Sequence, residues 1–113
     1  PCLNRIWREG HALSDAVVQT ALTIMARVPD TLIARKEGWE TAEEISERAR
    51  SVLDSGGALS EAGREALRGL DRVLRDEGHR RNPGTTADLT TASIFVFLVE
   101  QGPERIPEVI RRW

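Results

Sequence analysis

The stretch SDAVVQTALTIMARV, residues 14–28, carries the strongest structural signal in the sequence. Its apolar side chains recur at helical spacing in two adjacent rows. The rows are Val17, Ala21 and Ile24, and Val18, Leu22 and Met25. Because apolar residues cover most of the circumference of such a helix, we expect it to be central and buried. Ser14 is the expected N-cap, and Pro29 interrupts the pattern.

The sequence that follows this helix also has helical periodicity, divided by glycines, prolines and capping residues. We expect helices over residues 29–37, 41–53, 60–78 and 86–101, and a short last helix from residue 107. Thr41 and Glu44 have the spacing of a capping box. The apolar run 94–99 would also suit a buried strand, but its pattern extends back through Leu89 and no partner strand is visible. The predicted fold class is therefore all-α, a compact multi-helix domain over residues 1–113.

The composition is that of a soluble globular protein, with 113 residues, of which 40% are hydrophobic and 30% charged. The net charge of −2 argues against a non-specific nucleic-acid binder, which needs a strong basic excess. Cys2 is the only cysteine, so neither an internal disulfide nor a cysteine-based zinc site is expected. No apolar run is long enough for a membrane span, and the N-terminus lacks the pattern of a signal peptide. The expected location is the cytoplasm.

The first candidate functional segment is PDTLIARKEG, residues 29–38, directly after the apolar helix. Asp30 begins a short helix, on which Thr31 and Arg35 share a face. In the structural interpretation Asp30 caps the helix, while Arg35 and Lys36 are solvated. In the functional interpretation Asp30 binds a metal ion or a hydroxyl, and Arg35 and Lys36 bind phosphates.

The second candidate segment is HRRNPGTTAD, residues 79–88, a tight turn that opens the next helix. Thr85 or Thr86 can cap that helix, and Asp88 has capping-box spacing from Thr85. Free N–H groups at the helix start and the two preceding arginines would attract an anion. An ordinary helix start is the alternative interpretation. The candidate binding residues are Arg80, Arg81, Gly84, Thr85 and Thr86.

Taken together, the two segments resemble the triphosphoribosyl-dephospho-CoA synthase family. Its members carry a Met-Ala-x-x-x-Asp-Thr pattern followed by Arg and Gly, and later a Pro-Gly-Gly/Thr-Ser/Thr-Ala-Asp-Leu element. The first pattern corresponds here to Met25, Ala26, Asp30, Thr31, Arg35 and Gly38, and the second to residues 83–89. Both occur in the family's order, so the resemblance covers most of the chain.

The resemblance implies an all-α enzyme that transfers the triphosphoribosyl group of ATP to 3′-dephospho-CoA and releases adenine, making a prosthetic-group precursor. Asp30 and Asp88 are the expected catalytic and metal-binding residues, with Mg²⁺ as the metal. The family is longer, so the chain is expected to be the C-terminal portion of a larger helical protein. It would then associate with an N-terminal portion or form a homo-oligomer. The alternative is a non-catalytic all-α interaction module.

Overall fold

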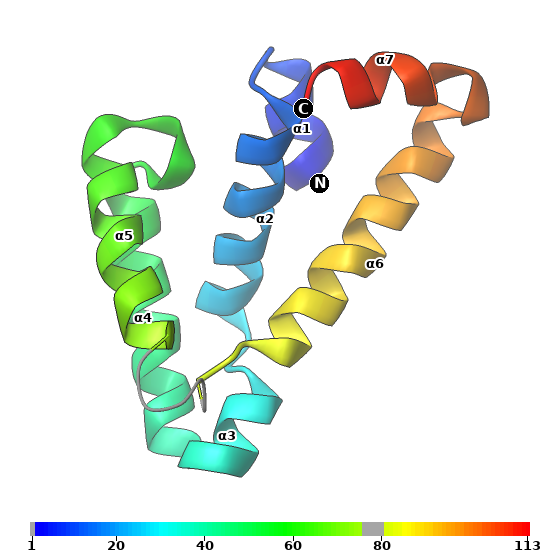
Figure 1. The fold of residues 1–113 in the computed structure, drawn as a ribbon. Helices are drawn as coiled ribbons and strands as arrows, with labels where there is room; N and C mark the ends of the chain where they lie inside the picture. Colours follow the sequence, from blue (N-terminus) through cyan, green and yellow to red (C-terminus); the bar gives the residue numbers. More distant parts are fainter. Residues whose placement is uncertain (1, 76–80) are drawn as a thin grey trace.

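The computed structural model describes residues 2–75 and 81–113, and this part of the chain folds into helices without strands (Figure 1). The prediction of an all-α fold is confirmed, and residues 94–99 belong to a helix. The elements are α1 (Cys2–Arg8), α2 (Leu13–Arg27), α3 (Thr31–Glu37), α4 (Trp39–Asp54), η1 (Gly57–Leu59), α5 (Glu61–Arg75), α6 (Gly84–Gln101), η3 (Pro103–Arg105) and α7 (Ile106–Arg111).

Helix α2 is the central element, as the sequence predicts, and it contacts α1, α4, α6 and η1. Figure 1 shows α4 and α5 side by side on one side of α2, while α6 diverges from α2 on the other side. Helices α1 and α7 lie at the end of the molecule where α2 and α6 are far apart, and α3 lies at the end where they approach. The expected Ser14 cap is wrong. Helix α2 begins at Leu13, two residues earlier than a Ser14 cap implies, and the Ser14 hydroxyl donates to the Trp113 carbonyl at 2.7 Å.

The apolar side chains form two separate clusters, one on each side of α2. The first joins α2 to α3, α4 and α5; its buried members are Leu22, Met25, Ala26, Ile33, Ala42, Ile45, Ala49, Val52 and Leu70. The second joins α2 to α1, α6 and α7; its buried members are Leu3, Ile6, Trp7, Leu13, Ala16, Phe97 and Val109. Burial on both sides explains why α2 has apolar residues around most of its circumference.

The start of α4 differs from its sequence-based position, whereas the start of α5 agrees with it. Helix α4 begins at Trp39, and the expected capping box of Thr41 and Glu44 does not form, because Gly38 turns the chain directly from α3 into α4. Ser60 does cap α5, since its hydroxyl accepts a hydrogen bond from the Gly63 N–H at 3.0 Å. No helix within residues 2–75 and 81–113 has the length and apolarity that a membrane span requires.

Candidate functional site

The centre of the candidate site is the carboxylate of Asp30, which joins α3 to α6. Its Oδ1 accepts hydrogen bonds from the backbone N–H groups of Leu32 (2.9 Å) and Ile33 (3.1 Å). Its Oδ2 accepts from the backbone N–H and the hydroxyl of Thr86, at 2.8 and 2.9 Å. One carboxylate therefore satisfies free donors at the starts of two helices, as an N-cap does. These contacts connect the two segments that the sequence singles out, 56 residues apart.

Burial distinguishes Asp30 from an open ligand-binding carboxylate. Its exposed fraction is 2%, and it is one of the largest fully buried side chains in the described part of the chain. A buried carboxylate needs several hydrogen bonds to offset its loss of water, and Asp30 has four. Both oxygens are thus engaged within the protein. Their geometry supports a positioning role for Asp30, while its expected metal-binding and catalytic roles stay predictions.

The start of α6 differs from the sequence-based prediction. Thr85 and Thr86 were expected to cap the helix, but α6 begins at Gly84 and Pro83 has no side-chain cap bond. Thr86 lies inside the first turn, and Asp30 supplies the cap from a distant part of the chain. This prediction of a local cap is wrong because tertiary contact provides a better acceptor, a charged and buried one.

Close packing explains Gly84, the residue between Pro83 and Thr85. A Cβ built there would collide with the side chain of Leu32 on α3. Beside it, the hydroxyls of Thr31 and Thr85 lie 2.6 Å apart at the surface. Gly84 thus leaves room for the end of the Leu32 side chain beside the start of α6.

We call the contact of Asp30 with the start of α6 the joint. The remaining predicted residues do not converge on Asp30. Arg35 and Lys36 are exposed in the last turn of α3. Arg81 is partly buried, and its Nε lies 4.0 Å from a carboxylate oxygen of Glu37. Asp88 is exposed on α6, and at two residues beyond Thr86 it points about 200° around the helix from it. Arg80 lies outside the described residues.

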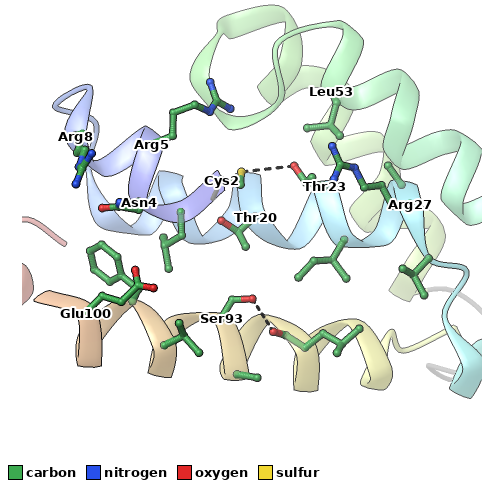
Figure 2. A pocket seen from close by; sticks show the side chains of 18 of the residues that line it. Cys2, Asn4, Arg5, Arg8, Thr20, Thr23, Arg27, Leu53, Ser93 and Glu100 are labelled. Carbon is green, nitrogen blue, oxygen red and sulfur yellow. Dashed lines mark hydrogen bonds between the residues drawn. The ribbon is translucent and has the colours of Figure 1, made fainter.

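A groove with a volume of about 1510 Å³ lies between α2 and α6 and across α1 and α4, and none of the described residues predicted for the site lines it (Figure 2). Near the joint it is lined by Val28 and Leu89, and at the far end by Arg8 and Glu100. Its charged residues are four arginines, Arg5, Arg8, Arg27 and Arg50, and two glutamates, Glu9 and Glu100. Sequence reasoning missed these arginines because they come from three helices and form no motif along the chain.

Metal binding has little support from side-chain clustering. Within the described ranges, no three His, Cys, Asp or Glu side chains come together in a way that could hold a metal ion. Mg²⁺ often binds through one or two carboxylates together with substrate phosphates. Asp88, the exposed carboxylate, fits that mode of binding better than Asp30, whose oxygens already accept four hydrogen bonds.

The architecture defines an all-α protein in which a buried aspartate joins two helix N-termini beside a groove that carries four arginines. Residues 1–106 match the CitG family, described as ATP:dephospho-CoA triphosphoribosyl transferase. The chain belongs to this family, which confirms the resemblance found in its sequence.

Curated relatives carry a corresponding name. A probable 2-(5''-triphosphoribosyl)-3'-dephosphocoenzyme-A synthase of Pseudomonas fluorescens is 35% identical over 102 residues, covering 90% of this chain and 34% of the relative. The Azotobacter vinelandii protein of the same name is 37% identical over 92 residues, covering 81% and 30%. The Pseudomonas paraeruginosa protein is 33% identical over 114 residues, covering 98% and 36%. The chain thus spans about a third of the length of these relatives. No solved structure matches the chain.

Proposed function

We propose that this chain is part of a cytoplasmic transferase that moves the triphosphoribosyl group of ATP to 3′-dephospho-CoA. In this reaction the bond between the ribose C1″ and adenine breaks, and a bond forms between C1″ and a ribose hydroxyl of the acceptor. The hydroxyl loses its proton and the departing adenine gains one. Membership of the family supports the reaction. The observation that carries the proposal to this chain is the contact of Asp30 with Thr86, which connects both family motifs in one joint.

We assign to Asp88 the role of the carboxylate that lies beside the reacting anomeric carbon. Transfer at an anomeric carbon passes through an oxocarbenium-like state, which a nearby carboxylate stabilises, by analogy with glycosidases. Asp88 is an exposed carboxylate on the first turns of α6, close in sequence to the paired hydroxyls of Thr31 and Thr85. Bound Mg²⁺ would neutralise phosphate charge, and Asp88 would be its protein ligand.

The cationic residues at the joint are assigned to phosphate groups. Arg35 and Lys36 are exposed on the last turn of α3, and their charges are open to a ligand. Arg81 is held by Glu37 at the edge of the joint. Guanidinium groups suit phosphate oxygens because they can donate two parallel hydrogen bonds. In this arrangement Asp30 positions the residues of the site and does not touch the substrates.

The test is adenine release by the full-length protein with ATP, Mg²⁺ and 3′-dephospho-CoA. We expect Asp88→Asn to abolish release while circular dichroism shows unchanged helicity, because the substitution is at an exposed position. Asp54→Asn, an exposed aspartate at the end of α4, is the matched control and should retain activity. If the unaltered protein releases no adenine with any CoA-like acceptor, the transferase assignment fails and a non-catalytic interaction module becomes the better interpretation.

A further inference from the structure

The groove beside α2 contains a local concentration of positive charge that the two sequence motifs do not include. Three of its four arginines come from different helices, Arg5 from α1, Arg27 from α2 and Arg50 from α4. Two glutamates also line the groove. Glu9 pairs with Arg5 at 3.6 Å in an exposed ion pair, which contributes little and is easily exchanged. The groove therefore keeps an excess of positive charge.

Arg5 and Arg27 both line the groove, and they lie on helices that contact each other. The Cys2 sulfur and the Thr23 hydroxyl lie 3.7 Å apart, which places the start of α1 against the middle of α2. Arg5 follows Cys2 by three residues and Arg27 follows Thr23 by four, so each arginine shares a helix face with a member of this contact. Figure 2 shows Arg27 extending back along α2 past Leu53 towards Thr23.

Arg50, on α4, is held against the C-terminal end of α2. Its guanidinium donates a hydrogen bond to the Ala26 carbonyl at 2.7 Å, next to Arg27 in the chain. This bond uses one N–H of the guanidinium, which has five. The remaining donors can bind a ligand in the groove.

The wall opposite these arginines is mostly apolar and ends at Glu100. Helix α6 presents Leu89, Ala92, Val96 and Phe97 to the groove, interrupted by the hydroxyl of Ser93. From Leu89 to Phe97 this wall extends about 12 Å along the helix. One wall thus suits an anion, and the other suits an uncharged organic group.

We propose that this groove is a binding site for a polyphosphate that carries an organic group, with Arg5, Arg27 and Arg50 holding the phosphates. Arginine matches phosphate geometry better than any other side chain, and a partly enclosed groove strengthens the attraction. An acidic helix of another protein is a different kind of occupant. Arg50 binds the carbonyl of Ala26, next to Arg27 in the chain, and this pairing of two guanidinium groups at one point of the groove favours the phosphate ligand.

The identity of the ligand rests on the proposed function, because the triphosphate of ATP and the diphosphate of 3′-dephospho-CoA share this chemistry. Isothermal titration of the full-length protein with ATP, 3′-dephospho-CoA or inorganic triphosphate, each alone, separates these sources. We expect Arg27→Ala and Arg5→Ala each to weaken binding of one nucleotide about 10-fold or more. Arg27→Lys should retain an intermediate affinity, since it keeps the charge but loses the planar donors. Arg48→Ala, on α4 with Arg50 but outside the groove lining, should not change it.

Because no turnover is needed, this test is independent of adenine release. Loss of nucleotide binding in the Arg27 variant supports the groove even if the protein releases no adenine. Unchanged affinity for all three anions in both arginine variants, with helicity intact, would overturn the groove site even in an active enzyme. Weakened binding of a protein partner in place of anion binding would also overturn it, and would favour an acidic helix as the occupant.

Discussion

At the scale of the residue, Asp30 has the most consequential position in the described structure. It accepts two hydrogen bonds on each carboxylate oxygen, and it is almost fully buried. Free N–H groups at the starts of two helices act on one negative charge, which is a favourable arrangement of helix dipoles. Asp30 therefore helps to fix α6 relative to α3, together with the hydroxyl pair of Thr31 and Thr85.

Replacement of Asp30 by asparagine should destabilise the protein. The amide group keeps only one acceptor oxygen, so at least one pair of buried donors would face an NH₂ group. We expect the free energy of unfolding to fall by about 2–4 kcal/mol, measured by urea denaturation of the full-length protein. Asp88→Asn is the control, and as an exposed substitution it should change stability by less than about 0.5 kcal/mol. Equal effects of the two substitutions would show that the Asp30 joint does not form in solution.

At the scale of the element, the contact of α5 with η1 depends on a glycine. Gly63 lies in the first turns of α5, and a Cβ there would collide with the backbone of Gly57. Ser60 supports the same corner, since its hydroxyl donates to the Ser55 carbonyl at 2.7 Å while it accepts from Gly63. At Gly69, in the same helix, a Cβ would meet only the end of the Arg72 side chain, at ordinary contact distance.

These two glycines of α5 should respond in opposite directions to alanine. Gly63→Ala forces backbone apart and should lower the free energy of unfolding by about 1–3 kcal/mol. Gly69→Ala meets no obstacle and should raise it by about 0.5–1 kcal/mol, because alanine favours the helix. Thermal unfolding of both variants measures the difference. A neutral Gly63→Ala would mean that α5 packs differently against η1.

At the scale of the whole molecule, α6 is attached at both ends and has an exposed apolar face along its length. Its start is bound by Asp30, and its later turns pack through Phe97 on Trp7, with the rings 5.8 Å apart. The Arg112 guanidinium lies over the Trp7 ring, 3.7 Å from its centroid, and also donates to the Trp7 carbonyl. Phe95 remains 68% exposed. This surface is where the expected association with another part of the protein, or with a second copy, can be sought.

Substitutions of two phenylalanines on α6 distinguish its packed face from its exposed face. Phe97→Ala should lower the free energy of unfolding by about 3–5 kcal/mol, because it empties the centre of the second apolar cluster. Phe95→Ala should change it by less than about 0.5 kcal/mol if the outer face of α6 is open to water. Guanidinium denaturation of the full-length protein compares the two. A large loss of stability in the Phe95 variant would show that this face is covered in solution.

The amino-acid sequence by itself predicted the α-helices from α2 onward, but not α1 or η1, and it gave the order of the two candidate segments. Periodic apolar residues identify α2 as central, and Gly38 and Gly102 mark helix ends, because these signals act within a few residues. The all-α fold and the family follow from such local patterns. The sequence also identified Asp30 as important, although it left its acceptor role and its exposure open.

Tertiary structure alone decided which partners these residues meet. The expected caps Ser14 and Thr85 failed where distant groups take part, the Trp113 carbonyl for Ser14 and the Asp30 carboxylate at the start of α6, whereas Thr41 failed because of the local turn at Gly38. The arginine groove was invisible in the sequence for a related reason. Arg5, Arg27 and Arg50 are far apart along the chain, and only the packing of α1 and α4 on α2 brings their charges into one groove. Local periodicity specifies the faces of helices, but the angles at which the helices pack depend on contacts throughout the molecule.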